Sequence, residues 1–428
     1  MNKSDITRDY CMLSGPLAKK GYDWWWHSFT AEHVRTGERK SFYIEYFLCN
    51  PALAQEQPML VWNDPEGRQA GKRPSYCMIN VGFWGKEKGQ LHRFFPWSQV
   101  SVPMNAPLNL KAGDCTCTET HMTGHVKVTP EEAAAHPEWM SDAGELEWDI
   151  QINKQVAYHV GYGASRFFRR LNAFEMFWHA EGMKTAFDGR LRLNGEEYRV
   201  HPDTCYGYAD KNWGRDFTSP WVWLSSNDLV STVTGRRLHN SVFEVGGGNP
   251  KVFGIALGRK LLGQFYYEGR DYEFNFSKFW TGSRTFFDCT ETAGQILWKV
   301  IQTTFKARME VEIACSKDEM LLINYESPDG YKRHTRLWNC GNGYGTVKLY
   351  EKRLTGIQQE AIAAGKQLLR LFQRHLGAAL ATQTVYFVLF FQPDKREILP
   401  IIPQAKFLPL IDSVNFLPQS TVIGRVEV

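Results

Sequence analysis

The stretch DGRLRLNGEEYRVHP (residues 188–202) decides the fold class, because apolar and polar residues alternate on both sides of Asn194-Gly195. Alternation with a period of two is typical of a β-strand with one buried face. An Asn-Gly pair readily adopts the positive φ angles of a type I′ turn, which joins two antiparallel strands. The stretch therefore predicts a β-hairpin, and strands are the expected elements on either side of it.

Strand-like runs of the same kind continue in both directions along the chain. They are KSFYIEYFLCN (40–50), SYCMINVGFWG (75–85), ELEWDIQIN (145–153), WVWLSSND (221–228), NSVFEVGGG (240–248), KVFGIALG (251–258), DYEFNFSKFW (271–280), RMEVEIACS (308–316), EMLLINYES (319–327) and GTVKLYEKR (345–353). Many short strands separated by turn residues are typical of antiparallel sandwiches and barrels. The sequence predicts an all-β protein.

Helical signals are few. In TPEEAAAHPEWMSD (129–142), Thr129 is a candidate N-cap and Pro130 suits the first helical position. Residues 355–381 carry an apolar stripe at helical spacing and predict one long helix. The apolar, proline-rich stretch 398–418 cannot continue that helix. We expect this tail to wrap over the body of the protein or over a neighbouring subunit.

The composition narrows the setting and the partners of the chain. Its 428 residues carry a net charge of +4 without a pronounced basic run, so we expect no nucleic-acid partner. Nine cysteines without a repeating spacing argue against a disulfide framework. The start MNKSDITRDYCML has no apolar core of a secretory signal, and no run of about 20 apolar residues predicts a transmembrane helix. We expect a cytoplasmic protein. Contact of the 355–381 helix with a membrane surface or with a second copy stays open.

A possible metal site lies in CTCTETHMTGHVK (115–127). If the stretch is one strand, Cys115, Cys117, Glu119, His121 and His125 share a face, and Cys and His are zinc ligands. The spacing matches no standard zinc motif, which favours a polar or solvated strand. GGGNPKVFG lies between two strands and lacks the context of a phosphate-binding loop. We predict neither a metal nor a cofactor.

The stretch CYGYADKNWGRDFTSPWVWLSSN (205–227) places an acid, a base and an amide side by side among aromatic residues. Along a strand, Tyr208, Asp210 and Asn212 face one way, and Lys211 and Trp213 face the other. The acid and the lysine therefore need not neutralise each other. An acid among aromatic rings favours its neutral form, which can donate a proton. The alternative is a structural cluster of hydrogen bonds that closes one end of a barrel.

The same stretch resembles the tocopherol cyclase family. Asp210-Lys211-Asn212-Trp213-Gly214 stands where that family has Glu-Lys-Asn-Trp-Gly, and WVW (221–223) follows, as its W.W motif does. GYDWWWHSF (21–29) resembles the family's Phe-Glu-Gly-Trp-Tyr strand. FEVGGGNP (243–250) and NGYGTVKLYEK (342–352) resemble its glycine triplet and a late strand. The resemblance covers about residues 14–353, and the 205–227 stretch is its specific part.

The resemblance implies a fold and a reaction. The fold is two tandem lipocalin-like antiparallel β-barrels or sheets, here residues 1–187 and 188–353, with the C-terminal helix and proline-rich tail in 354–428. The reaction is closure of a chromanol ring without a redox cofactor. A prenyl double bond is protonated and a phenol oxygen attacks the resulting cation. This chain departs from the pattern, because both acids are shortened to Asp and Trp24 replaces a glycine. The substrate therefore stays open.

The candidate residues follow from the motif. We expect Asp210 to be the general acid, Lys211 and Asn212 to orient it or set its charge, and His179 to deprotonate an attacking hydroxyl. Asp23 and Glu45 are second candidates for the acid. Aromatic residues would line a cavity for an apolar prenylated or unsaturated substrate: Trp25, Trp26, Tyr208, Trp213, Trp221 and Trp223.

Two alternatives to an enzyme stay open. One is a lipocalin-like carrier of a lipid or isoprenoid, in which the same aromatic residues bind without catalysis. The other is a peripheral membrane protein or oligomeric scaffold that uses the helix and tail beyond residue 354. For each aromatic residue taken singly, a place in the hydrophobic core remains an equally good interpretation.

Overall fold

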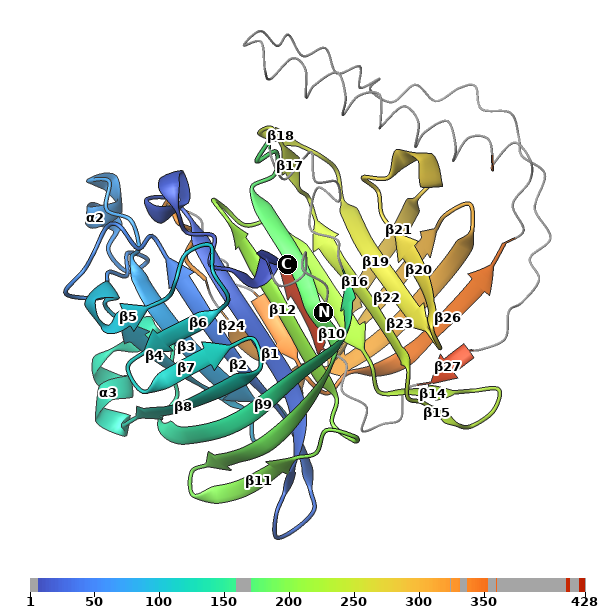
Figure 1. Ribbon diagram of the computed structural model, residues 1–428, viewed down its shortest axis with the longest axis horizontal. Helices are drawn as coiled ribbons and strands as arrows, with labels where there is room; N and C mark the ends of the chain where they lie inside the picture. The colour runs from blue at the N-terminus through green and yellow to red at the C-terminus, as the bar shows by residue number, and fades with distance from the viewer. Residues whose placement is uncertain are drawn as a thin grey trace, which may run out of the picture.

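The computed structural model describes residues 7–158, 171–323, 325–331, 337–352, 359, 413–415 and 423–427. The described chain is built almost entirely of antiparallel strands, which confirms the predicted all-β class (Figure 1). The short helices are α2 (Pro65–Gln69), α3 (Pro130–Ala135) and the 3-10 turns η1 (Gly15–Ala18), η2 (Trp97–Gln99), η3 (Pro137–Trp139), η4 (Phe279–Thr281) and η5 (Lys317–Glu319).

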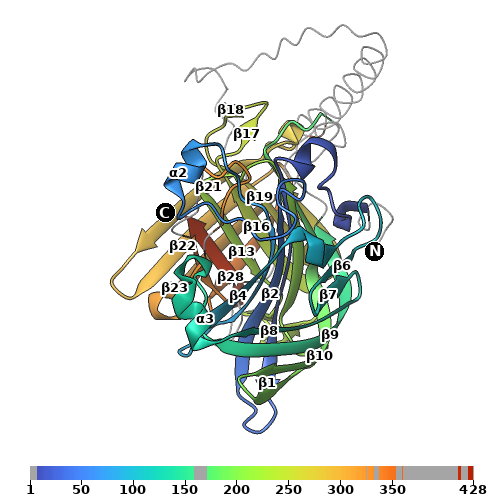
Figure 2. The same cartoon turned by 90° about the vertical axis from the view of Figure 1, so that its left-hand side faces the viewer.

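Twelve strands form one sheet, which we call the first β-unit. They are β1 (Tyr22–His33), β2 (Arg39–Cys49), β3 (Tyr76–Phe83), β4 (Gly89–Phe95), β5 (Val100–Ser101), β6 (Asn109–Ala112), β7 (Cys115–Thr118), β8 (His121–Val128), β9 (Gly144–Tyr158), β10 (Met176–Leu193), β11 (Glu196–Val200) and β12 (Gly207–Gly214). Their order is β4-β3-β2-β1-β11-β10-β9-β8-β7-β6-β5, and β12 lies between β1 and β10 beyond the end of β11. The sheet is strongly curved, so that β8, β9 and β10 cross in front of β2 and β4 (Figure 2).

The hairpin predicted at 188–202 is confirmed. Strands β10 and β11 pair from Gly189 with Val200 to Leu193 with Glu196. Asn194 and Gly195 have φ angles of +49° and +90°, as a two-residue turn of this type needs. The predicted boundary after residue 187 falls inside β10, and the sheet of the first β-unit continues to Gly214. Whether the chain folds as separate domains stays a prediction.

The later strands form two seven-stranded sheets, which we call the second β-unit. The first has the order β20 (Arg270–Phe274), β19 (Lys260–Tyr267), β16 (Ser241–Gly248), β13 (Trp221–Ser226), β28 (Ile423–Glu427), β25 (Leu337–Cys340) and β24 (Leu321–Ile323). The second has β15 (Arg237–Leu238), β14 (Leu229–Ser231), β27 (Ser413–Asn415), β26 (Tyr344–Glu351), β23 (Ala307–Ser316), β22 (Gln295–Thr303) and β21 (Arg284–Glu291). Strands β17 (Lys251–Val252) and β18 (Ile255–Ala256) form a small hairpin of their own.

Alternation along the strands creates three hydrophobic clusters. On β1, Trp25 and Phe29 point into a cluster enclosed by the first sheet. Trp24 and Trp26 point the other way, into an aromatic cluster that also contains Trp223 of the second β-unit. We call this second cluster the aromatic layer, because it packs the two β-units against each other. The third cluster lies between the two sheets of the second β-unit.

Several sequence expectations needed correction. The helix expected over 129–142 ends at Ala135, because Pro137 has no N–H to continue it; Thr129 and Glu132 form the capping box. The helix expected at 355–381 lies outside the described residues except Gln359. Of the tail, only residues 413–415 are described, and they pair with β14 and β26. A disulfide, Cys315–Cys340, links β23 to β25 and was not expected.

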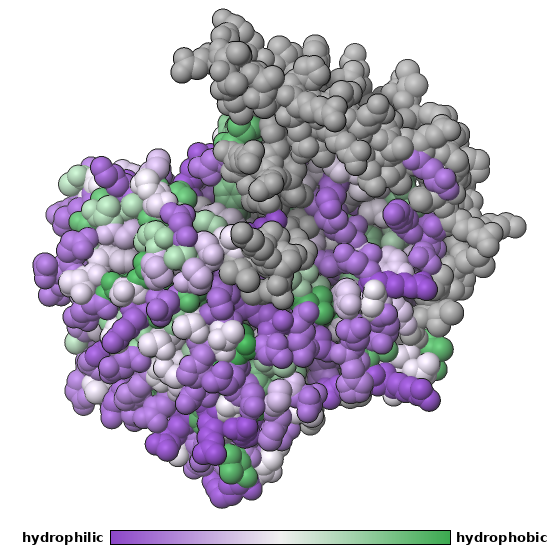
Figure 3. Space-filling model, in the orientation of Figure 1, coloured by the Kyte–Doolittle hydropathy of each residue, from purple (hydrophilic) through white to green (hydrophobic). Residues whose placement is uncertain are grey.

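The polarity of the surface agrees with strands that bury their apolar faces. In the view of Figure 3 the described residues are mostly hydrophilic, and hydrophobic residues are scattered among them. No helix among the described residues is long and apolar enough to cross a membrane.

Candidate functional site

Asp210 lies in the aromatic layer, at the centre of β12. Its side chain is 6% exposed. Asp210 Oδ2 accepts hydrogen bonds from Trp178 Nε1 at 2.8 Å, from the Tyr208 hydroxyl at 3.1 Å and from Asn212 Nδ2 at 3.5 Å. Alternation therefore brings Tyr208, Asp210 and Asn212 to one face, as the sequence predicted, and β10 supplies Trp178 beside them.

Lys211 points to the opposite face of β12, away from Asp210. It forms an ion pair with Asp23 on β1, and both side chains are fully buried. The ammonium also lies 3.8 Å from the centre of the Trp25 ring and 5.5 Å from that of Trp213. Burial raises the pKa of Asp23 to about 6, although the Lys211 charge opposes this rise. Lys211, Asp23 and Trp25 thus form a group apart from Asp210.

A second carboxyl group approaches Asp210 from the other β-unit. Glu244 lies on β16 and is fully buried. Its Oε1 atom accepts hydrogen bonds from Trp223 Nε1 at 2.8 Å and from the Tyr208 hydroxyl. The Tyr208 hydroxyl therefore lies between Glu244 and Asp210 and contacts a carboxyl oxygen of each. Burial raises the pKa of Glu244 well above its usual range, and the Asp210 charge adds to the effect.

If both acids are ionised, the site has one proton fewer than its two contacts to the Tyr208 hydroxyl require. A phenol has a single hydrogen to donate, and here it contacts two carboxyl oxygens. Two carboxylates that bind one hydroxyl stand about 5 Å apart, which costs about 3 kcal/mol at an effective dielectric constant of about 20. That repulsion is roughly a hundredfold in a protonation equilibrium. This repulsion favours an extra proton shared by the two carboxyls and Tyr208, in the same direction as the raised pKa of Glu244.

A narrow cavity borders Asp210. Among the described residues that line it, Asp210 is the only acid, and Trp26, Trp178, Trp221 and Trp223 form most of its walls. The volume open to a water-sized probe is about 20 Å³, which is enough for about one water molecule. The cavity as it stands is smaller than an apolar substrate.

A larger cavity of about 450 Å³ adjoins it. Trp221, Val222 and Gly247 contribute to the walls of both cavities. The larger one is further lined by Arg259, Phe287 and Cys289, with the Arg259 guanidinium 4.2 Å from the centre of the Phe287 ring. Its volume falls within the usual range of small-molecule sites. Asp288 and Glu291 also line the larger cavity, and Trp221 is the aromatic residue that lines both cavities.

The glycine triplet 246–248 permits close packing at this point. A Cβ on Gly246 would lie only 3.0 Å from the Trp178 ring. Cβ atoms on Gly247 and Gly248 would fall 2.3 Å from the Lys260 carbonyl oxygen and 2.0 Å from that of Pro220. The absence of a side chain at Gly246 thus lets β16 approach Trp178 of the first β-unit, whereas Gly247 and Gly248 permit close packing within the second β-unit.

Glu45 lies on the same face as Asp210 but two strands away. In the register, Asp210 is opposite Trp26, and Trp26 is opposite Glu45. Glu45 Oε2 accepts hydrogen bonds from Asn80 Nδ2 at 2.9 Å and from the Tyr325 hydroxyl at 3.1 Å. Trp26 stacks on Tyr43, with their ring centres 4.5 Å apart. The Trp26 ring therefore separates this acid from Asp210.

The structure also separates His179 from Asp210. His179 follows Trp178 on β10 and points into the first β-unit, where its Nε2 atom lies 3.8 Å from Asp9 Oδ1. Lys154 Nζ is close to three carboxyl groups there, at 2.7 Å from Glu181, 3.1 Å from Asp9 and 3.2 Å from Glu119. Although burial opposes it, the Lys154 charge lowers the pKa of Glu181 to about 2. The ammonium occupies the space between the carboxyls that a metal ion would need.

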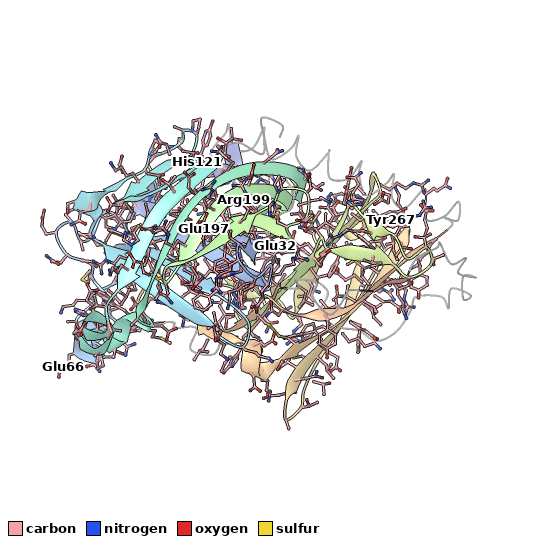
Figure 4. The ribbon with its side chains drawn as sticks, turned by 90° about the horizontal axis from the view of Figure 1, so that it is seen from below. Glu32, Glu66, His121, Glu197, Arg199 and Tyr267 are labelled. Atoms are coloured by element: carbon pink, nitrogen blue, oxygen red, sulfur yellow. A yellow bond between two sulfur atoms is a disulfide. The ribbon has the colours of Figure 1, made fainter. Side chains whose placement is uncertain are left out.

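The stretch 115–127 is not one strand. It folds into β7 and β8, so Cys115 and Cys117 are buried in the first β-unit. His121 and His125 on β8 contact Asp149 and Glu145, both at 2.7 Å. Figure 4 labels His121. The turn after Thr118 therefore removes the shared face on which a cysteine–histidine site would depend.

Sequence reasoning missed Trp178 and Glu244. Trp178 precedes His179 on β10, but its contact with Asp210 depends on the pairing of β10 with β12. Glu244 had a signal of its own, because it is a lone acid between Phe243 and Val245 in an otherwise apolar strand. An acid in such a place is costly to bury unless it has a partner. The partner itself comes from packing between the two β-units.

Comparisons with known proteins give little further guidance. No protein-family model matches the chain, and no curated protein sequence matches it significantly. Two solved structures are similar over most of the chain. A candidate AttH from Nitrosomonas europaea has 12% identity and a TM-score of 0.40, covering 78% of this chain and 89% of its own. Kievitone hydratase from Nectria haematococca has 10% identity and a TM-score of 0.41, covering 97% and 93%. Because both TM-scores are below 0.5, we draw no conclusion from them.

Proposed function

We propose that this protein is an acid–base enzyme that protonates a carbon–carbon double bond of an apolar substrate, with Asp210 as the proton donor. The observation that carries the proposal is the place of Asp210 in the wall of an aromatic cavity, beside a carboxyl–phenol–carboxyl cluster that holds an extra proton. Burying two carboxyl groups is costly. A carrier of apolar ligands gains nothing from that cost, whereas a proton donor needs it.

The walls of the cavity suit the charge that such a reaction creates. Protonation of an alkene leaves a carbocation, and the faces of aromatic rings attract a cation. Trp26, Trp178, Trp221 and Trp223 surround the position where that charge would form. The cation is then quenched by a hydroxyl oxygen of the same substrate or loses a proton from an adjacent carbon. In either case a proton returns to the carboxyl, so no cofactor is consumed.

Within this class we favour cyclisation of a prenylated substrate, because the 205–214 motif resembles that of the tocopherol cyclases. The substrate would occupy the larger cavity and reach Asp210 after Trp221 turns aside. Asn212 would orient Asp210 through their hydrogen bond. Lys211, Asp23 and His179 would take no direct part, since they face the interior of the first β-unit.

The test compares three proteins: the wild type, Asp210→Asn and the exposed control Asp203→Asn. Native mass spectrometry of the purified protein first identifies the apolar compound that it carries, and a panel of prenylated hydroquinones extends the search. Turnover in D₂O should place one deuterium on the former alkene carbon of the product. We expect Asp210→Asn to lose this activity by about 100-fold or more, the usual contribution of general acid catalysis, while Asp203→Asn keeps it. Equal turnover in all three would remove Asp210 from the role, and ligand binding without conversion would favour the carrier.

A further inference from the structure

We propose that Glu244, Tyr208 and Asp210 form a proton relay across the two β-units, in which Glu244 stores the proton that reloads Asp210. The inference rests on the proposed function of Asp210 as the donor. It adds a residue from the second β-unit that no motif of the first one suggests. Its geometric basis is the Tyr208 hydroxyl, which contacts Asp210 Oδ2 at 3.1 Å and Glu244 Oε1.

Only Tyr208 can pass a proton among the described groups that contact these two carboxyls. Trp178 and Trp223 hold Asp210 and Glu244 by indole N–H groups, which donate but do not accept. Asn212 contacts Asp210 through its amide nitrogen, also a donor. A phenol donates and accepts at the same oxygen, so it can give its proton to one carboxyl and take one from the other. The indoles therefore fix the carboxyls in place and Tyr208 connects them.

The relay balances its protons. At rest Glu244 holds the extra proton and Asp210 is a carboxylate. Once the substrate is bound, the Tyr208 proton moves to Asp210 and the Glu244 proton moves to Tyr208, and the neutral Asp210 then gives its proton to the substrate carbon. When the substrate cation is quenched, the proton that the product releases returns through Asp210 and Tyr208 to Glu244. All three groups end as they began, and no other reactant is needed.

The surroundings of Glu244 favour storage of a proton. Among the described residues, the titratable groups that interact with Glu244 are Tyr208 and Asp210 on β12, Tyr206 before that strand and Tyr158 on β9. Each of these groups is an acid, so none of them stabilises a carboxylate by positive charge. Glu244 Oε2 is buried and makes no hydrogen bond to the described residues. A carboxyl group in this position is more stable when it is protonated.

Infrared spectroscopy tests the storage without any substrate. The full-length wild type should show the carbonyl band of a protonated carboxylic acid at neutral pH, and the band should shift in D₂O. Glu244→Gln keeps the size of the side chain and its contact with Trp223, and it should lose this band. Glu147→Gln, on the surface of β9, is the matched control and should keep it. An unchanged band in Glu244→Gln would overturn the proposal.

Rapid-mixing kinetics with the substrate tests the relay. The stored proton must pass through Tyr208 to Asp210 before the substrate is protonated, so Tyr208→Phe and Glu244→Gln should slow the first turnover and the later ones by about 100-fold. Asp210→Asn should lose the first turnover as well. Steady-state rates equal to the wild type in both relay variants would overturn the relay. A first turnover that survives in Asp210→Asn would instead overturn the proposed function and leave the infrared result to decide the storage.

Discussion

Lys211 is paired with Asp23 on the neighbouring strand and not with Asp210, the residue next to it in the chain. Both partners are fully buried on the inner face of the first sheet. Asp210 on the outer face is therefore not neutralised by the nearest base in the sequence. The motif divides into a structural half that faces the first β-unit and a half that faces the aromatic layer.

Replacing Lys211 with Met should destabilise the protein by about 3–5 kcal/mol, because it leaves the Asp23 carboxyl buried without its partner. The double variant Asp23→Leu, Lys211→Met removes both charges and should recover most of that loss. Urea unfolding followed by tryptophan fluorescence measures both values. Lys111→Met, at an exposed position on β6, should stay within about 0.5 kcal/mol of the wild type. A double variant as unstable as Lys211→Met would show that the pair does more than neutralise itself.

His27 should make the protein less stable in acid. Burial lowers the pKa of His27 to about 4. An unfolded chain takes up a proton at its usual pKa of about 6.5, whereas the folded protein resists the proton until about pH 4. This stability is therefore present above pH 6.5 and is lost as the pH falls toward 4. The loss is about 2 kcal/mol between pH 7.5 and pH 5.

The measurement compares His27→Gln with the wild type at both pH values. The difference in unfolding free energy between them should shrink by about 2 kcal/mol at pH 5, since glutamine does not titrate. His201→Gln, at an exposed position, should show a constant difference. A difference that does not change with pH in His27→Gln would mean that His27 keeps an ordinary titration in the folded protein.

Gly246→Ala should disturb the contact between the β-units. The added methyl would meet the Trp178 ring at 3.0 Å, and that ring holds Asp210 through a hydrogen bond. We expect a loss of about 1–3 kcal/mol in stability from overpacking, together with a drop in turnover. Gly258→Ala is the control, because no atom lies within 4 Å of the Cβ that it adds. If Gly246→Ala matches this control in melting temperature and activity, the close approach of Gly246 to Trp178 contributes to neither stability nor turnover.

Strand β28 should be required for the second β-unit. It lies between β13 and β25 and pairs with both. Gly424→Pro removes a backbone N–H from the ladder and should weaken it by about 1–3 kcal/mol. Hydrogen exchange of residues 221–226 reports the effect directly, and deletion of Val428 alone is the control. Unchanged protection of β13 in Gly424→Pro would contradict the pairing.

Local pattern was enough to predict the class of the fold and the direction of the motif side chains. The period of two in 188–202 gave the hairpin, and the same period separated Asp210 from Lys211. These features depend only on neighbours in the chain. The helix predicted after Thr129 was too long, although Pro137, which ends it, was visible in the sequence.

Contacts between distant strands could not be predicted in this way. Glu244 meets Tyr208 only because the two β-units pack together, and Lys154 meets Asp9 across 145 positions in the chain. The role expected of His179 stays a prediction, and in the structure its side chain faces the first β-unit, near Asp9. Successive side chains of β10 point to opposite faces, so Trp178 contacts Asp210 in the aromatic layer and the next residue, His179, points away from it.

The position of β28 also affects how the protein is made. Trp223, which holds Glu244, lies on β13, and the neighbour of β13 on one side is synthesised roughly 200 residues later, on the order of 10–40 s at ordinary translation rates. During that interval β13 has one open edge on the ribosome, where unpaired strands are prone to aggregate. In the first β-unit β1 also waits for a late partner, β12, but that unit is complete at Gly214. The candidate site, which draws on both units, is therefore among the last parts of the nascent chain to take its final form.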